Sequence, residues 1–326
     1  MDRKTGAGRT IGVSVFISTY NQENYIRDAL EGALKQKTDF LFEILVHDDA
    51  STDRTGEIVK EYEKQYPDKI VALYEAFNTY DHPEYASKRM LAAARGKYIA
   101  LCDGDDYWTD ENKLQIQYDF MEAHEDFSLC THNTLLINTK TGESKLYGKA
   151  SATGELPQGY VLERGCSLFH SSSHFLLRQD WAEKHGDQPM FDLYRVIYSA
   201  AAGRVMYFDR CMSVYRSNTC GSWSEHTFSD PIHEVSDLLS QEAFMKKADE
   251  ETGYRWHKHF KKNILSIRYK LLGLALQFYR SFDFKDRFVW LMKWTRDCFG
   301  LFPCWVKFRK QIGRFRRFTG KKRKLL

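Results

Sequence analysis

The chain has 326 residues, of which 43% are hydrophobic and 28% are charged, so it is long and apolar enough to bury a substantial core. Its net charge of +4 is uneven, because residues 305–326 contain ten Lys or Arg and no Asp or Glu, which leaves 38 basic against 44 acidic residues elsewhere. An acidic body with a basic tail argues against a general nucleic-acid-binding protein and fits an enzyme that contacts an anionic surface at one end.

Cysteine spacing and hydropathy bear on the compartment. None of the seven cysteines forms a C-x-x-C pair, so we expect free thiols rather than a disulfide framework or a zinc site. The first residues lack the apolar stretch of a signal peptide, and the longest apolar runs have nine residues, whereas a membrane span needs about 20. We therefore expect a cytoplasmic protein that is not integral to a membrane.

The first part of the chain alternates strand and helix patterns. Apolar runs rich in Val and Ile predict strands at residues 11–18, 42–47, 70–74 and 97–102. Apolar residues at helical spacing predict helices at 22–36, after 51, at 84–95 and from about 111. This alternation predicts an α/β fold with a mostly parallel central sheet that helices cover on both faces.

The remaining elements are less regular until the chain becomes helical. We expect strands at 127–137 and 205–208, loops over 140–165, and helices at 178–186, at 190–202 and from about 228 onward. Apolar residues between 260 and 278 step at intervals of four and three, which predicts a helix packed on its own domain or a self-association seam.

Polar clusters follow three of the predicted strands. They are residues 18–21 (STYN), 48–51 (DDAS) and 103–106 (DGDD). Because ligands of parallel sheets bind beyond the carboxyl ends of the strands, these clusters predict one site. Asp103, Asp105 and Asp106 repel one another unless they share a cation, and hard oxygen ligands suit Mg²⁺ or Mn²⁺. The alternative for this cluster alone is an acidic turn before the next helix.

Three segments together resemble glycosyltransferase family 2. They are residues 13–21 (VSVFISTYN), 46–53 (VHDDASTD) and 96–108 (GKYIALCDGDDYW). The resemblance is strong over 11–125, weaker over 126–224 and absent afterwards. It implies inverting nucleotide-sugar transfer on a GT-A (Rossmann-like) fold. The implied division is a transferase domain at 1–225, with a nucleotide-sugar half at 11–125 and an acceptor half at 126–225, then a helical region at 226–304 and a tail at 305–326.

The resemblance also implies residue roles in the nucleotide-sugar half. Ser18 and Tyr20 would line the base pocket, and Asp49 would bond a uracil-type base. In the D-x-D motif, Asp103 would contact the ribose and Asp105 would hold the metal, Mn²⁺ or Mg²⁺, that neutralises the departing diphosphate.

In the acceptor half, the resemblance implies a general base. Asp192 precedes Gly203, a strand and the pair Tyr215-Arg216 at the spacing that the family uses, and Asp187 is the competing candidate. Arg216 would contact a phosphate or form a structural ion pair. His174 would at most contact the acceptor.

The tail 305–326 interleaves aromatic and basic residues, which is typical of helices on anionic membranes, while a solvated tail is the alternative. We therefore expect a metal-dependent transferase of the hexosyltransferase type, which moves a sugar from a donor of the UDP class to a glycan or lipid-linked acceptor during cell-surface polysaccharide synthesis. The alternatives are a sugar-1-phosphate nucleotidyltransferase and a non-catalytic, membrane-tethered module. Neither nucleic acid nor a transmembrane helix is expected.

Overall fold

The computed structural model describes residues 10–79, 83–148, 152–178, 192–219 and 231–278. Its first part alternates strands and helices as the sequence predicts, because apolar runs fill the sheet and amphipathic segments cover it. These elements are β1 (Ile11–Thr19), α1 (Ile26–Leu34), β2 (Leu41–Asp48), α2 (Thr55–Gln65), β3 (Ile70–Tyr74), α3 (Pro83–Ala93), β4 (Tyr98–Asp103) and α4 (Lys113–Ala123).

The second part holds more structure than the sequence predicts. It comprises β5 (Tyr107–Trp108), β6 (Phe127–Asn138), β7 (Ser144–Leu146), β8 (Gly154–Leu156), α5 (Gln158–Arg164), the 3₁₀ turns η1 (Gly165–Ser167) and η2 (Ser171–Ser173), β9 (Phe175–Leu177), α7 (Asp192–Ala202), β10 (Arg204–Ser217), α9 (Pro231–Glu251) and α10 (His257–Phe278).

Two expectations for this part need correction. The prediction of loops over 140–165 is wrong, because β7, β8 and α5 lie there and are held by pairing with β6 and β10 and by packing. The strand predicted at 205–208 is the start of the much longer β10, whose bulges against β6 break the apolar pattern. The helix predicted at 178–186 falls mostly outside the described residues.

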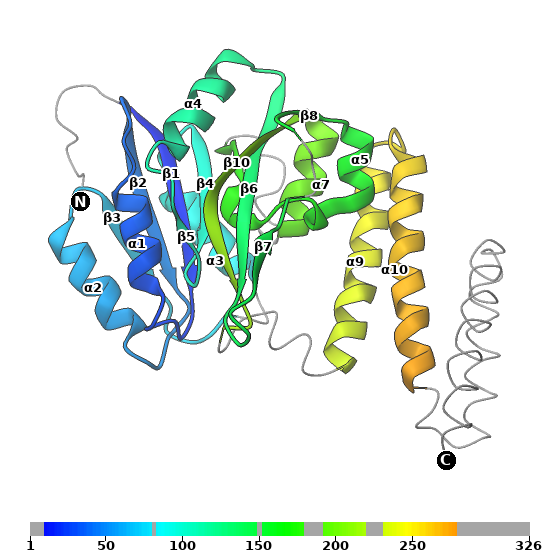
Figure 1. Cartoon of the computed structure of the whole chain (residues 1–326), viewed down its shortest axis with the longest axis horizontal. Coiled ribbons are helices and arrows are strands. Elements are labelled where there is room, and N and C mark those ends of the chain that lie inside the picture. Colours follow the sequence, from blue (N-terminus) through cyan, green and yellow to red (C-terminus); the bar gives the residue numbers. More distant parts are fainter. Residues whose placement is uncertain (1–9, 80–82, 149–151, 179–191, 220–230, 279–326) are drawn as a thin grey trace.

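The strands form one mostly parallel sheet in the order β3-β2-β1-β4-β9-β6-β10-β5 (Figure 1). β1, β2, β3 and β4 are parallel to one another, and β6 is parallel to β10. The short β9 lies antiparallel between β4 and β6 and joins the two halves. The predicted α/β fold with helices on both faces is therefore confirmed.

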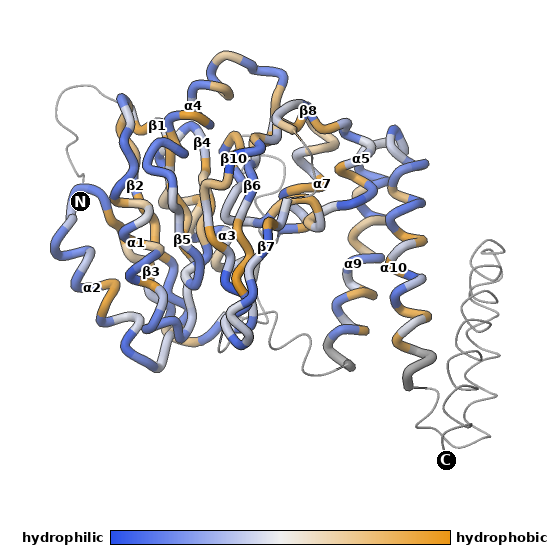
Figure 2. The backbone as a smooth tube through the Cα atoms, viewed as in Figure 1, coloured by the Kyte–Doolittle hydropathy of each residue, from blue (hydrophilic) through white to orange (hydrophobic). Residues whose placement is uncertain are grey.

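Each face of the sheet carries its own hydrophobic core. Alternate residues of β1 point to opposite faces, so that Val15 belongs to the core that includes residues of α1, α2 and α4, while Phe16 belongs to the core that includes residues of α3, α5 and α7. Figure 2 shows that apolar residues are concentrated along the strands and on the inner sides of the helices. The two cores hold the sheet between its helices, and the polar residues lie at the carboxyl ends of its parallel strands.

The helical region packs on the rest of the chain. Phe260, Ile267 and Leu271 of α10 are buried in the same core as Phe16 of β1, beside α9 and α5. This confirms packing of the apolar stripe on its own chain. The boundary expected at 225 lies outside the described residues and stays a prediction.

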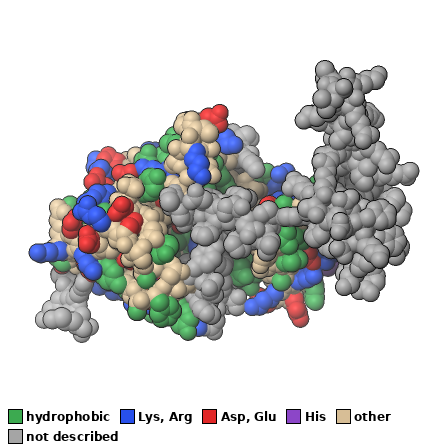
Figure 3. All heavy atoms as spheres, turned by 90° about the horizontal axis from the view of Figure 1, so that it is seen from below, with side chains coloured by type: hydrophobic (Ala, Val, Ile, Leu, Met, Phe, Trp, Pro, Cys, Tyr) green, Lys and Arg blue, Asp and Glu red, His purple; other side chains and the backbone are tan. Residues whose placement is uncertain are grey.

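The face of the molecule seen in Figure 3 is mixed in charge. On the face in Figure 3, basic and acidic side chains are interspersed rather than gathered by sign. Exposed ion pairs such as Arg27–Glu61 and Arg54–Glu57 also lie on the surface of the described residues. No helix within the described ranges combines the length and the apolar character that crossing a membrane requires.

Candidate functional site

The carboxyl ends of β1, β2 and β4 meet at one edge of the sheet. Ser18 of β1 is in register with His47 of β2 on one side and with Asp103 of β4 on the other. The three polar clusters that follow these strands therefore lie together, as the strand-end rule predicts.

Ser18, Tyr20 and Asp49 lie on the β1–β2 side of this edge. Ser18 is exposed, and its carbonyl oxygen accepts a hydrogen bond from the backbone N–H of Gly104 at 2.8 Å. One oxygen of Asp49, Oδ1, accepts hydrogen bonds from the backbone N–H and the hydroxyl of Thr79, both at 2.7 Å. Thr79 thus holds the Asp49 carboxylate in a fixed orientation, and Tyr20 is partly exposed beside this strand end.

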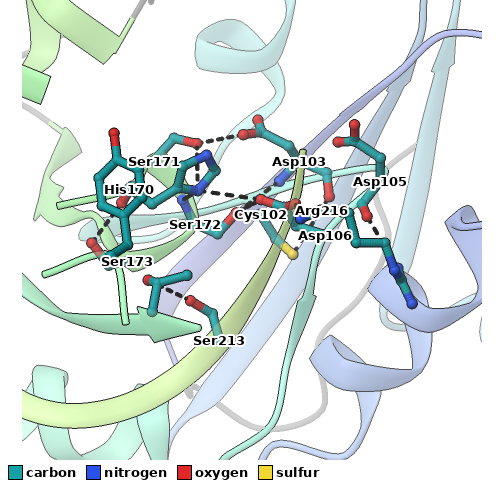
Figure 4. Close-up of polar contacts among 12 residues, drawn as sticks. Cys102, Asp103, Asp105, Asp106, His170, Ser171, Ser172, Ser173, Ser213 and Arg216 are labelled. Atoms are coloured by element: carbon teal, nitrogen blue, oxygen red, sulfur yellow. Dashed lines mark hydrogen bonds and ion pairs between the residues drawn. The ribbon is translucent and has the colours of Figure 1, made fainter. Parts of the chain in front are cut away.

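The turn after β4 depends on Gly104. A Cβ atom at this position would lie 2.3 Å from Oε1 of Gln22 and 2.7 Å from Cβ of Thr19, so a larger residue would displace the end of β1. This close approach lets Asp103 and Asp105 project in the same direction (Figure 4).

Asp105 is almost fully buried. Its Oδ2 accepts a hydrogen bond from the Thr219 hydroxyl at 2.6 Å, and its backbone oxygen accepts one from Nη1 of Arg216 at 3.0 Å. Burial and the charge of Asp103 raise the pKa of Asp105, while Thr219 and Arg216 oppose the rise, and together these effects place the pKa at about 6. A divalent cation between these carboxylates would relieve their repulsion.

Asp106 is fully buried and binds the second half of the chain. Its Oδ1 accepts a hydrogen bond from the backbone N–H of Arg216 at 3.0 Å, and its Oδ2 accepts one from the Ser172 hydroxyl at 2.6 Å. Nδ1 of His170 lies 3.3 Å from the same Oδ2. Burial raises the pKa of Asp106, and the charges of Asp105 and Asp103 raise it further. Asp106 therefore links the end of β4 to β10 and to the η2 turn, a structural role that the sequence pattern did not predict.

The turn at residues 170–173 brings a second set of polar groups to the acidic cluster. The Ser171 hydroxyl donates a hydrogen bond to Asp103, and Ser172 contacts Asp106, as Figure 4 shows. Burial lowers the pKa of His170 to about 4, so its imidazole is neutral at pH 7. No sequence motif marks this turn, and its partners lie more than 60 positions away along the chain, so its place in the site could not be predicted.

Asp103, Asp106 and His170 could hold a metal ion, since one ligand atom from each lies within 4.8 Å of the others. Asp105 adds a further carboxylate beside Asp103. Hard carboxylate oxygens fit Mg²⁺ and Mn²⁺, and a cation at this edge would offset several negative charges at once. The residues present therefore fit a divalent cation.

Asp192 lies in the same cluster, although it is 89 positions from Asp103 along the chain. It is the first residue of α7, its side chain is 41% exposed, and it forms an ion pair with Arg195. Desolvation and the charge of Asp103 raise the pKa of Asp192, while Arg195 and the contact with the Ser171 hydroxyl oppose the rise, and together these effects place the pKa at about 6. The competing base, Asp187, lies outside the described residues.

Arg216 is held beside the site by ring contacts and an ion pair. Its guanidinium lies 4.4 Å from the ring centre of Tyr107 and 5.2 Å from that of Tyr25, and it is paired with Asp28. The structural ion pair that the sequence left open is therefore present. Its contact with the Asp105 backbone keeps the positive charge next to the acidic cluster.

His174 needs a correction, because it is fully buried below this edge. Its two ring nitrogens have no hydrogen-bond partner among the described residues, and its ring lies edge-on to Phe169. Burial holds the pKa of His174 well below its usual value. Since the side chain does not reach the surface, we exclude it from the acceptor contacts.

Comparisons with known proteins agree with this geometry. Residues 14–186 match the family model described as Glycosyl transferase family 2. An uncharacterized protein of Mycobacterium bovis is 34% identical over 215 residues, which cover 65% of this chain and 60% of the relative, so the match spans less than two thirds of its length. The putative teichuronic acid biosynthesis glycosyltransferase TuaG of Bacillus subtilis is 36% identical over 33% of this chain and 41% of its own.

Two solved structures share the fold at low sequence identity. Residues 1–349 of S. aureus TarS, solved with UDP-GlcNAc, superpose with a TM-score of 0.62 at 18% identity over 85% of this chain and 78% of that one. The mannosyltransferase PcManGT from Pyrobaculum calidifontis, solved with GDP-Man and Mn²⁺, gives 0.52 at 15% identity over 94% and 85%. The central sheet with its acidic strand ends thus follows the GT-A arrangement, and because the family model covers more than half of the chain, this protein belongs to glycosyltransferase family 2.

Proposed function

We propose that this glycosyltransferase is metal-dependent and inverting, and that it moves a sugar from a UDP-linked donor to a hydroxyl of a glycan or lipid-linked acceptor. The observation that carries the proposal is the meeting of Asp192 with Asp103 at the polar edge, where the Ser171 hydroxyl contacts both. A base next to the donor carboxylates is what displacement by an acceptor hydroxyl requires.

The donor would lie along the ends of β1, β2 and β4. Ser18, Tyr20 and Asp49 would bind the base, Asp103 would bind the ribose, and Asp105 would hold Mn²⁺ or Mg²⁺. The cation would neutralise charge on the departing diphosphate. The UDP-GlcNAc of the TarS structure supports the UDP class, whereas the GDP-Man of PcManGT makes GDP the donor to compare against.

In the reaction, Asp192 would accept the proton of the acceptor hydroxyl. The hydroxyl oxygen then forms a bond to the anomeric carbon from the side opposite the diphosphate, and the bond between that carbon and the diphosphate breaks. Arg216 would contribute a positive charge beside the leaving group. Its guanidinium is held in place by the ion pair with Asp28 and by the hydrogen bond to the backbone oxygen of Asp105.

The setting that we propose is cell-surface polysaccharide synthesis. The name of the TuaG relative supports this setting. The basic, aromatic tail at 305–326, which lies outside the described residues, would touch anionic lipid. Sedimentation of the full chain with vesicles that contain phosphatidylglycerol, but not with pure phosphatidylcholine, is the expected result. Equal recovery with both vesicles would contradict the tail proposal.

The test of the reaction compares two aspartates. With Mn²⁺ and UDP-glucose, UDP-GlcNAc or GDP-mannose, release of the nucleoside diphosphate should occur with one of the UDP donors. Asp192→Asn should lower kcat about 10²- to 10⁴-fold with little change in the donor KM. Asp119→Asn, at an exposed position of α4, is the matched control and should retain activity. Full activity of Asp192→Asn would overturn the role of Asp192, and release from GDP-mannose alone would overturn the UDP assignment.

A further inference from the structure

Three aromatic side chains gather on the β6–β10 side of the polar edge. The rings of His170 and Tyr215 are stacked, with their centroids 3.8 Å apart and their planes at 19°. The ring of Tyr147 stands nearly perpendicular to both, at 5.6 Å from His170 and 6.0 Å from Tyr215. Tyr147 and Tyr215 are partly exposed, and the His170 side chain, which is 11% exposed, presents only a small part of its ring.

This aromatic cluster is held rigidly. The Tyr147 hydroxyl donates a hydrogen bond to the backbone oxygen of Cys166 at 3.2 Å. Nδ1 of His170 lies 3.3 Å from the buried Asp106 carboxylate, and Tyr215 lies in β10, in register with Leu136 of β6. The three rings are therefore held by the segment after β7, by the η2 turn and by the central sheet. Because they are already held, little side-chain entropy would be lost when a ligand binds.

The cluster adjoins both the proposed base and the donor carboxylates. Ser171, the neighbour of His170, contacts Asp103 and Asp192, and Figure 4 shows His170 and Ser171 on one side of Asp103 with Asp105 on the other. Burial raises the pKa of Tyr147, and the nearby charge of Asp192 is among the further causes. In sheet order, β4 separates this cluster from the base-binding ends of β1 and β2.

A pyranose ring has an apolar face of C–H groups and polar hydroxyls around its edge. The negative face of an aromatic ring attracts such C–H groups, and carboxylates beside it accept hydrogen bonds from the hydroxyls. The aromatic cluster and the proposed base Asp192 together present this combination.

We propose that Tyr147, His170 and Tyr215 form an acceptor subsite that stacks on the apolar face of a saccharide ring and directs one of its hydroxyls to Asp192. This inference rests on the proposed transferase function. It narrows the acceptor to a molecule whose reacting end is a sugar ring.

The experiment uses the full chain saturated with UDP and Mn²⁺, and methyl glycosides of glucose, galactose, mannose and N-acetylglucosamine as probes. Saturation-transfer NMR should show at least one glycoside bound through the protons of one ring face. Tyr215→Leu and Tyr147→Leu should each weaken its binding about 2- to 12-fold, as expected for the loss of one aromatic contact. Tyr215→Phe keeps the ring and should bind within twofold of the unmodified chain.

Tyr254→Leu is the matched control, since Tyr254 is 59% exposed and lies between α9 and α10. Stabilisation by UDP with Mn²⁺ in each variant separates a folded, donor-binding chain from a damaged one. If UDP stabilises the unmodified chain and no glycoside binds, or if the Leu variants bind the glycoside as well as the control does, the subsite is wrong. If UDP does not stabilise the unmodified chain, the donor assignment fails instead.

Discussion

Crowded carboxylates dominate the site at the scale of single residues. Asp105 and Asp106 are buried within reach of Asp103, and burial together with mutual repulsion raises the pKa of each of the two. Neutral donors such as the hydroxyls of Thr219 and Ser172 offset only part of this repulsion. The arrangement is stable enough to form, and a divalent cation would stabilise it further.

The pH dependence of metal binding follows from these shifts. The folded pKa of Asp105, about 6, lies above its ordinary value near 4, so its contribution to stability falls as the pH rises from about 4 to about 6, and the full penalty is present at pH 7.5. Mn²⁺ should therefore raise Tm more at pH 7.5 than at pH 5.0 in thermal-shift measurements. Asp105→Asn should raise the metal-free Tm and remove most of the Mn²⁺ effect. Equal shifts at both pH values would contradict this account.

The reaction should depend on pH through Asp192. Its pKa of about 6 means that the carboxylate, which is the form that can accept a proton, dominates above pH 6. A cation beside Asp103 would lower this pKa, because the charge of Asp103 is one cause of the rise. We expect kcat/KM to fall about tenfold per pH unit below the pKa of Asp192, which is about 6 without the cation and lower with it. A flat profile between pH 4.5 and 7 would show that Asp192 is not the base.

At the scale of elements, hydrogen bonds from α4 and β5 hold the η2 turn in place. Nε1 of Trp108 donates a hydrogen bond to the backbone oxygen of Ser172 at 3.0 Å, and Nε2 of Gln117 donates one to that of Ser173, also at 3.0 Å. Nζ of the buried Lys113 donates to Oε1 of Gln117 at 2.7 Å and lies 4.0 Å from the centre of the Trp108 ring. These contacts fix the turn that carries His170, and through it the acidic cluster.

Lys113 contributes these contacts, but burying its amine costs free energy, and the size of this cost depends on pH. Burial lowers the pKa of Lys113 to about 7, so the folded chain gives up a proton that the unfolded chain keeps until about pH 10.5. The stability contributed by this site should therefore rise as the pH rises from 7 to 10.5. We expect Lys113→Met to increase the free energy of unfolding at pH 7.5 by about 1–2 kcal/mol, since removing the desolvated amine outweighs the lost hydrogen bond to Gln117.

Urea unfolding at pH 7.5 and at pH 10 tests this expectation. The gain from Lys113→Met should shrink at pH 10, where the lysine of the unfolded chain begins to lose its proton too. Lys64→Met, at an exposed position of α2, is the control and should change stability by less than about 0.5 kcal/mol. Lower stability of Lys113→Met at pH 7.5 would show that the amine contributes more than its burial costs.

At the scale of the whole molecule, one core runs from the central sheet into the C-terminal helices. Phe16 and Ile99 of the sheet, Val196 of α7 and Phe260 of α10 belong to the same buried cluster. The helical region is therefore packed against the transferase fold and not simply attached to it. We expect the described parts of the chain to unfold together.

Phe260→Ala tests this continuity. The side chain is fully buried, so its removal should cost about 3–5 kcal/mol in the free energy of unfolding. The loss should appear in a single urea transition that tryptophan fluorescence and far-UV circular dichroism report at the same midpoint. Leu239→Ala, at an exposed position of α9, should change stability by less than about 0.5 kcal/mol. Two separate transitions would show that the C-terminal helices fold independently.

Local patterns in the sequence determined the elements and the polar edge. Alternating apolar strands and amphipathic helices predicted β1 to β4 within a few residues, including β3 at its observed bounds, because such periodicity reflects burial on a sheet or a helix face. Asp103 and Asp105 could be assigned to the site from their place after a strand, since parallel strands end at a common edge. Asp192 was predicted from family resemblance; the structure places it beside Asp103, and its role as the base stays a prediction.

Contacts between distant segments were decided only by the tertiary structure. The insertion of β9 between β4 and β6 brings the η2 turn to the aspartates, buries His174 and places His170 against Tyr215. The ion pair of Arg216 with Asp28 joins residues 188 positions apart. No periodicity encodes such pairs, because they arise from strand order and packing, and these long-range contacts complete the site whose strand ends the sequence had marked.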